Sequence, residues 1–153
     1  MLFVCLGNIC RSPLAEGILR RKAQERGISI EIDSAGTGDY HLGELPDPRS
    51  RKVGLACGCN MDMRARQVRS SDFKEFDVIV AMDQMNLRDL KRWPEARDAC
   101  LRLATSFDPS AVSESVPDPY YGELEDFEFV RDMLEVICDG ILNEVATKEK
   151  SVS

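Results

Sequence analysis

Apolar and polar residues alternate along the chain in blocks that predict strands and helices in turn. Residues 2–6 (Leu-Phe-Val-Cys-Leu) form a short apolar run typical of a buried strand. Ser12-Pro13 has the composition of a helix start, because serine can cap a helix and proline suits its first turn. The residues that follow predict a helix as far as Gly27, a residue type that commonly ends helices. The chain therefore begins as a strand, a loop and a helix.

The middle of the chain repeats this order. Residues 28–32 alternate strictly between apolar and polar, which predicts a half-exposed strand, and residues 33–48 predict a polar loop rich in glycine and proline. Asp47-Pro48 is a second cap-and-proline helix start, and the helix is expected to end near Gly58. Residues 76–82 are mostly apolar, the pattern of a strand buried on both faces of a parallel sheet.

The remaining residues contain one further strand between two helices. Residues 86–93 predict a helix that Pro94 closes, and residues 101–107 predict a weaker strand. Residues 108–122 form a long polar loop. From residue 123 to about residue 146, apolar side chains recur at helical spacing.

This order of elements predicts a single doubly wound α/β domain over residues 1–153, with a four-stranded parallel sheet and helices on both faces. We expect residues 1–147 to form the ordered core and residues 148–153 to be a frayed tail. In such sheets, ligands bind beyond the carboxyl ends of the strands, where the winding direction reverses. The loop after the first strand is therefore the first candidate for a binding site.

Composition narrows the classes of function. The net charge of −7 argues against a nucleic-acid partner, which would require a basic face. No apolar stretch approaches the roughly 18 residues of a membrane span. The N-terminus lacks the basic start and apolar core of a signal peptide, so we expect a cytoplasmic protein without a membrane partner.

The cysteines are expected to be free thiols in that reducing compartment, although the chain has six of them. Cys57 and Cys59 are separated by one residue and the chain has a single histidine, so they cannot complete a structural zinc site unless Cys100 or Cys138 joins them. We expect Cys100 and Cys138 in the core, and therefore no metal site.

The loop after the first strand concentrates residues that carry chemistry. Five residues separate Cys5 from Arg11, a spacing that is a weak indication alone because both residue types recur in the chain. Gly7 and Asn8 accept left-handed backbone conformations, and a helix starts directly afterwards. Such a loop can turn its N–H groups inward as an anion-binding nest at the positive end of the helix.

A phosphate monoester fits a loop of this kind. Arg11 offers a planar fork to two phosphate oxygens, and a thiol at the base of a positive field is held as a nucleophilic thiolate. Cys5 is then placed for in-line displacement at phosphorus, while the N–H groups and Arg11 stabilise the equatorial oxygens. Ser12 could donate its hydroxyl to the thiolate, and Asn8 could brace the loop.

Turnover also requires an acid to protonate the leaving oxygen and then a base to activate water. Three Asp-Pro dipeptides offer candidates at Asp47, Asp108 and Asp118. The residues alone leave the choice among them open.

Residues 4–13 (Val-Cys-Leu-Gly-Asn-Ile-Cys-Arg-Ser-Pro) resemble the phosphate loop of the low-molecular-weight protein tyrosine phosphatases. The likeness covers essentially the whole chain in family order, through residues 33–37, 46–49, 65–67, 81–83 and 118–122. It implies a phosphocysteine mechanism without metal or organic cofactor, in which Cys5 is the nucleophile and Arg11 a catalytic phosphate binder. The implied phosphate-binding loop consists of Leu6, Gly7, Asn8, Ile9, Cys10, Arg11 and Ser12.

The same resemblance implies roles outside this loop. Asp118 heads the segment Asp-Pro-Tyr-Tyr-Gly and is implied as the acid and then the base. The residues implied around the substrate crevice are Tyr40, Tyr120 and Tyr121. His41, next to Tyr40, is expected on the crevice rim, where it touches substrate or only solvent. A phenyl ring stacked between these tyrosines would favour phosphotyrosine over the shorter phosphoserine, whose phosphorus would not reach a deep thiolate.

Two residues have alternative roles at this point. In the family, the cysteine that matches Cys10 can form a reversible disulfide with the nucleophile, here Cys5, which would protect it from over-oxidation. The alternative for Cys10 is simple packing. Asp83 either supports the active loop, as the resemblance implies, or caps a helix, and the two roles are compatible.

The expected activity is hydrolysis of a tyrosine-phosphorylated protein or a small aryl phosphate, with phosphate as product. The expected protein is a monomer that self-associates weakly at most. A thiol-dependent arsenate reductase is disfavoured because residues 83–99 contain no cysteine. Ile9 and the double tyrosine disfavour a phosphoarginine phosphatase, and the presence of both Cys5 and Asp118 disfavours a non-catalytic phosphotyrosine-binding module.

Overall fold

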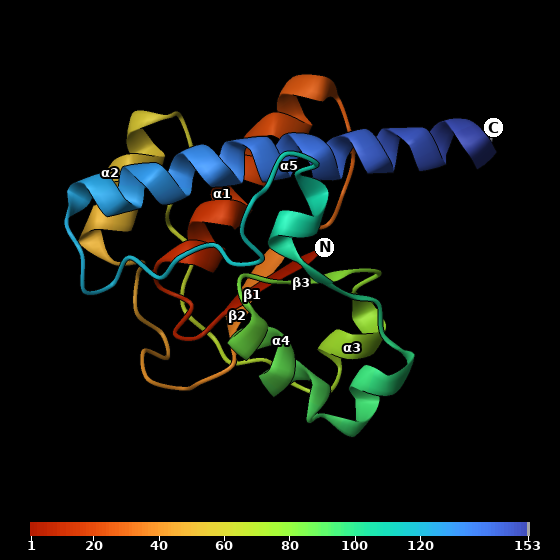
Figure 1. Cartoon of the computed structure of the whole chain (residues 1–153), viewed down its shortest axis with the longest axis horizontal. Helices are drawn as coiled ribbons and strands as arrows, with labels where there is room; N and C mark the ends of the chain where they lie inside the picture. Colours follow the sequence, from red (N-terminus) through yellow and green to blue (C-terminus); the bar gives the residue numbers. More distant parts are fainter. Residues whose placement is uncertain (153) are drawn as a thin grey trace.

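The computed structural model describes the backbone of residues 1–152 and the side chains of residues 1–149. Strands alternate with helices along the chain (Figure 1). In order, the elements are β1 (Leu2–Cys5), α1 (Arg11–Arg26), β2 (Asp33–Gly36), α2 (Pro48–Ala56), α3 (Asp72–Glu75), β3 (Ile79–Ala81), α4 (Gln84–Lys91), the 3-10 helix η1 (Pro94–Asp98), β4 (Leu101–Leu103), the 3-10 helix η2 (Ala104–Phe107) and α5 (Leu124–Val152).

The four strands form one parallel sheet in the order β2-β1-β3-β4. Leu2 of β1 pairs with Asp33 on one side and with Ile79 on the other. The chain leaves β1 for one neighbour and later returns to the other side, so the winding direction reverses at β1. The predicted doubly wound α/β fold with a four-stranded parallel sheet is confirmed.

Helices cover both faces of this sheet. Figure 1 shows α1, α2 and α5 on one side, and α3 and α4 on the other. β1 contributes to both layers: Phe3 and Cys5 pack in the core beneath the first group of helices, whereas Leu2 and Val4 pack in the core beneath the second. A strand buried on both faces reads as a continuous apolar run, as this one does.

The second strand does not lie where the alternation predicts it. Residues 28–32 are irregular, and β2 is Asp33–Gly36, inside the segment predicted as a loop. Ile32 is buried, and Ile28 and Ile30 pack against the same core. These three side chains produce a strand-like pattern although their backbone is not in the sheet, so the prediction for this strand is wrong.

Other boundaries also differ from the predicted ones. The strand expected over residues 101–107 is paired with β3 only as far as Leu103, and η2 follows directly. The final helix continues to Val152, because no glycine or proline interrupts residues 141–152. Fraying of residues 148–153 stays a prediction, and residue 153 lies outside the described residues. In the described part of the chain, no helix is both long and apolar enough to cross a membrane.

Candidate active site

The loop between β1 and α1 turns its carbonyl groups outward. Four donors from neighbouring segments hold these carbonyls: the N–H groups of Thr37, Gly38 and Asp47 donate to Cys5, Leu6 and Ile9 at 2.9, 3.0 and 2.8 Å, and the Ser50 hydroxyl donates to Cys10 at 2.9 Å. In the described part of the chain, the N–H groups of residues 6–10 make no such internal hydrogen bond. They are therefore free to bind an anion inside the loop.

Asn8 fixes the shape of this loop. Its φ angle of 56° lies in the left-handed region, and its side chain is buried. The Asn8 Oδ1 accepts from the N–H of Arg66 at 3.0 Å, while Nδ2 donates to the hydroxyls of Ser12 and Ser34 at 2.8 and 3.0 Å. Ser34 in turn donates to Glu16 at 2.6 Å, and burial raises the pKa of the Glu16 carboxyl. One amide thus links the loop to α1, β2 and the segment before α3.

The Cys5 thiol lies at the base of the loop and is only 3% exposed. Its Sγ is 3.0 Å from Ser12 Oγ. Either atom can be the donor in this contact; Asn8 donates to the same oxygen, which leaves the Ser12 proton available to a Cys5 thiolate. Ser12 lies inside α1, which begins at Arg11 and has Cys10 as its N-cap, so the predicted capping role for Ser12 is wrong.

Arg11 is buried beside the thiol. Its Nη1 donates to Asp83 Oδ2 at 2.6 Å and to the Val116 carbonyl at 2.9 Å, and its Nη2 lies 3.7 Å from Asp118 Oδ2. Burial acts against the charge, but Cys5 and Asp83 outweigh it and raise the pKa of Arg11. Asp83 also accepts from the N–H of Asn86 and so caps α4, which means that it makes both of the contacts expected for it.

The three Asp-Pro aspartates lie in different surroundings. Asp47 caps α2 and pairs with Arg49, and Asp108 accepts hydrogen bonds within a turn from Ser110. Asp118 faces the loop cavity, with a side chain that is 45% exposed, and accepts from the N–H of Tyr120 at 3.1 Å. Of the three, it is Asp118 that can reach a group bound above Cys5.

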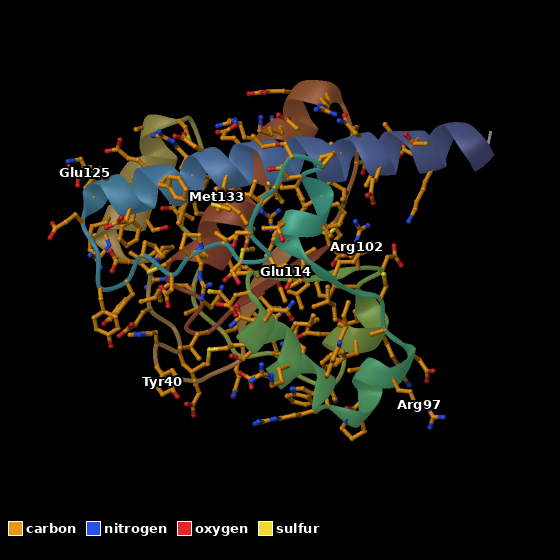
Figure 2. All side chains as sticks on the ribbon, in the orientation of Figure 1. Tyr40, Arg97, Arg102, Glu114, Glu125 and Met133 are labelled. Carbon is orange, nitrogen blue, oxygen red and sulfur yellow. The ribbon has the colours of Figure 1, made fainter. Side chains whose placement is uncertain are left out.

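A cavity of about 320 Å³ opens above the thiol. Tyr40 and Tyr121 stand at its exposed rim, and Tyr40 projects from the edge of the molecule in Figure 2. The rings of Tyr120 and Tyr121 pack edge to face, with their centroids 4.9 Å apart. His41 Nδ1 lies 2.6 Å from Glu44 Oε2. The cavity is lined by Cys5, Leu6, Gly7, Ile9, Cys10, Arg11, Tyr40, His41, Asp118, Tyr120 and Tyr121. Of the residues assigned to the site from the sequence, Asn8 and Ser12 lie behind this lining.

The remaining cysteines differ in their surroundings. Cys10 is buried, and burial, followed by the nearby Asp47 carboxylate, raises the pKa of its thiol. Cys57 and Cys59 have their sulfurs 3.5 Å apart, and no group of three or more potential metal ligands occurs among the described residues. Cys138 is buried as expected, whereas Cys100 is exposed, so its predicted place in the core is wrong. Cys100 directly precedes β4, where the chain is at the surface.

Several supporting residues escaped the sequence reasoning. Glu16 and the carbonyl of Val116 have no local signal that connects them with residues 5–12. Ser34 and Arg66 lie in the matched segments 33–37 and 65–67, but neither residue was given a role, and the first of these segments was predicted as a loop. Arg49 lies in another matched segment and was given no role.

The fold and the loop together define a class of protein: α/β phosphatases that hold a cysteine thiol beneath a phosphate-binding loop. Comparison of sequences identifies the family within that class. The sequence profile described as low molecular weight phosphotyrosine protein phosphatase matches residues 1–151. A low molecular weight protein-tyrosine-phosphatase of Streptomyces coelicolor is 44% identical over 149 residues, which cover 94% of this chain and 91% of that protein. The chain belongs to the low molecular weight phosphotyrosine protein phosphatase family.

Solved structures agree with this assignment. A protein tyrosine phosphatase from Entamoeba histolytica superposes with a TM-score of 0.91 at 42% identity, over 97% of each chain. A Drosophila arginine phosphatase has a TM-score of 0.88 at 29% identity and covers 94% of this chain and 96% of its own. The predicted family, fold and enzyme class are confirmed.

Proposed function

We propose that the protein hydrolyses phosphotyrosine, and small aryl phosphates, through a phosphocysteine intermediate. Cys5 Sγ attacks phosphorus in line with the phenolic oxygen, so an S–P bond forms as the P–O bond to the aryl group breaks. Asp118 gives its proton to the departing oxygen. The free N–H groups of the loop and the guanidinium of Arg11 bind the three equatorial oxygens.

The second step reverses the role of Asp118. The carboxylate now takes a proton from water, the water oxygen attacks phosphorus, and the S–P bond breaks to release phosphate and the Cys5 thiolate. The Ser12 hydroxyl stabilises this thiolate as the leaving group.

The contact between Cys5 and Ser12 carries the proposal. A buried core cysteine has no need of a hydroxyl proton, whereas a thiolate is stabilised by one. Here Asn8 donates to the Ser12 oxygen and is itself held by the N–H of Arg66, so that Ser12 is placed to donate to a Cys5 thiolate. The sulfur is thus prepared as a nucleophile at the base of a cavity that Arg11 and Asp118 also line.

The aromatic rim supports an aryl substrate. Tyr40, Tyr120 and Tyr121 line the mouth of the cavity, where a phenyl ring can stack while its phosphate reaches Cys5. We expect a tyrosine-phosphorylated protein as partner, a monomeric enzyme, and a reducing compartment such as the cytoplasm. Cys10 is proposed as the redox partner of Cys5, and the pair requires reducing conditions to stay active.

A pH–rate profile on an aryl phosphate tests the acid. For the wild type, kcat/KM reports the first step, in which Asp118 acts as the acid, and should fall on the basic side of the profile. The Asp118→Asn variant should be slower and should lose this basic limb. Asp108→Asn is the matched control, since Asp108 also heads an Asp-Pro dipeptide but lies away from the cavity. A basic limb that persists in Asp118→Asn would contradict the proposal.

Substrate class requires a separate comparison, because a structurally similar protein is an arginine phosphatase. Phosphotyrosine and phosphoarginine peptides of the same sequence should be assayed side by side. We expect the higher kcat/KM for phosphotyrosine, and a clear preference for phosphoarginine would overturn the substrate assignment while leaving the mechanism in place.

A further inference from the structure

The loop that carries Asp118 is long and lies largely at the surface between η2 and α5. It is anchored before Asp118 by Val116, whose N–H donates to the Met82 carbonyl at 2.9 Å and whose own carbonyl accepts from Arg11 at 2.9 Å. After Asp118 the chain makes a tight turn, closed by the N–H of Gly122 on the Pro119 carbonyl at 2.9 Å. The position of the acid therefore depends on what holds this turn.

Arg49 of α2 holds the turn by two of its carbonyl groups. Its Nη2 donates to the Tyr120 carbonyl at 2.9 Å, and its Nη1 donates to the Gly122 carbonyl at 2.8 Å. Tyr120 is also the residue whose N–H donates to the Asp118 carboxylate. The same peptide segment thus contacts Arg49 on one side and the proposed acid on the other.

The guanidinium of Arg49 is itself fixed in orientation. Asp47 accepts from its Nε at 3.0 Å and from its Nη2 at 2.9 Å, which is the two-point contact that holds a guanidinium in one plane. The Arg49 Cζ lies 4.4 Å from the centre of the Phe127 ring on α5. Asp47 also donates its N–H to the Ile9 carbonyl at 2.8 Å. A continuous series of contacts therefore joins the phosphate loop, Asp47, Arg49 and the turn after Asp118.

We infer that Arg49 is a positioning residue for the general acid. It does not line the cavity and has no direct contact with a bound phosphate; it acts by setting where the Asp118 carboxylate stands relative to the phosphate loop. The inference rests on the proposed role of Asp118. Its consequence is that loss of Arg49 damages proton transfer to the leaving group more than it damages phosphate binding.

The test compares leaving groups. Arg49→Met removes the guanidinium, with every donor and its contact with Phe127, but keeps an unbranched side chain, and Arg49→Lys keeps the charge but removes the fork. For each, kcat/KM is measured with p-nitrophenyl phosphate, whose leaving group needs little protonation, and with phenyl phosphate, whose leaving group needs much. Arg49→Met should lower kcat/KM about tenfold for phenyl phosphate and much less for p-nitrophenyl phosphate. Tenfold is a part of the roughly 10²–10⁴-fold rate acceleration that a general acid provides. Arg49→Lys should show the same difference at smaller size.

Arg102→Met is the matched control. Arg102 makes the same kinds of contact as Arg49: a fork on Glu144 at 2.8 and 3.2 Å, a backbone carbonyl at Ser106, and the face of Phe107 at 3.9 Å. It does not line the cavity, and in Figure 2 it lies well away from Tyr40. Its loss should lower the thermal midpoint and leave the ratio of kcat/KM values for the two substrates unchanged.

The Asp118→Asn background separates this inference from the proposed function. If Arg49 acts through Asp118, Arg49→Met should add no further leaving-group effect once the carboxyl is gone. An equal loss for both substrates, or the same loss in both backgrounds, would show that Arg49 has a merely structural role. If Asp118→Asn alone leaves the leaving-group dependence unchanged, the proposed acid is wrong, and that result is seen without any Arg49 variant.

Discussion

The loop that holds Cys5 and the loop that holds Asp118 meet at one cavity but are built in opposite ways. Most residues of the first loop are buried, with Asn8 2% and Cys5 3% exposed, although Leu6 is 43% exposed; neighbours on several sides bond its carbonyls and side chains. The second loop is open to solvent: the Asp118 side chain is 45% exposed, and Tyr121 is 96% exposed. The first loop is therefore preorganised, whereas we propose that Asp118, as the acid, is positioned by Arg11 directly and by Arg49 through the turn that follows it.

This difference follows from what each loop has to do. Stabilising phosphate oxygens in the transition state requires donors that do not reorganise, so rigidity is useful there. The acid must give up a proton in one step and take one from water in the next, which requires access to solvent. In the proposed mechanism, Arg11 and Arg49 keep the exposed Asp118 in a defined position.

Replacement of the nucleophile should break the first loop's function most completely. Cys5→Ser should lower kcat for an aryl phosphate by at least about 10⁴-fold, because a serine hydroxyl in this loop is a poor nucleophile. Inorganic phosphate should still bind, since the N–H groups and Arg11 remain. Cys100→Ser, at an exposed thiol, serves as the control and should retain full turnover; activity in Cys5→Ser near that of the wild type would refute the role of Cys5.

Variants of Asn8 separate two contributions of this residue to stability: its side-chain hydrogen bonds and its left-handed backbone conformation. Asn8→Gly keeps the left-handed backbone accessible but loses three side-chain hydrogen bonds, at about 1 kcal/mol each. Asn8→Ala loses the same bonds and adds about 1 kcal/mol for the φ angle. Urea unfolding should therefore rank the wild type above Asn8→Gly and Asn8→Ala last. Equal stability of the two variants would mean that the backbone conformation costs nothing.

The smallest expected effect concerns the Asp47–Arg49 pair at the start of α2, which links the two loops. Side-chain hydrogen bonds from Arg49 hold the pKa of the Asp47 carboxyl below its ordinary value. The folded state then binds this proton less readily than the unfolded chain does. The resulting stability is present above the unfolded pKa, about 4, and is lost as the pH falls through the lower folded value.

Arg49→Met should remove that contribution. Its free energy of unfolding should fall less steeply than that of the wild type as the pH is lowered from about 4, when both are measured by urea unfolding at each pH. Arg102→Met should keep the wild-type slope in this range, if Asp47 is the group responsible. Identical slopes for the wild type and Arg49→Met would contradict the assigned coupling.

The sequence predicted the first loop well because its information is local. An apolar strand, a left-handed turn and a helix start lie within residues 2–13, and the residues that face the phosphate site are in the same segment. The strand over residues 28–32 failed for a related reason. Alternating side chains report which residues pack against the core, and Ile28, Ile30 and Ile32 do so without pairing in the sheet.

The residues that hold the site in place from other parts of the chain could not be predicted from local patterns. Arg49 and Arg66 are chemically identical to the other arginines of the chain, and only the folded backbone shows which carbonyls and carboxylates they reach. The choice of Asp118 among three Asp-Pro aspartates likewise came from the family resemblance. Contacts between residues far apart in the chain leave no periodic trace in the sequence.

Direct capture of the phosphorylated cysteine is the most decisive measurement. The wild-type enzyme is mixed rapidly with an aryl phosphate, quenched within a turnover, and analysed by mass spectrometry of the peptide that contains residues 1–20. A burst of phenol no greater than one equivalent per enzyme, together with one phosphate on Cys5, is the predicted result, and Asp118→Asn should change the amount that accumulates without moving the site. Turnover without any phosphate on Cys5 would contradict the account.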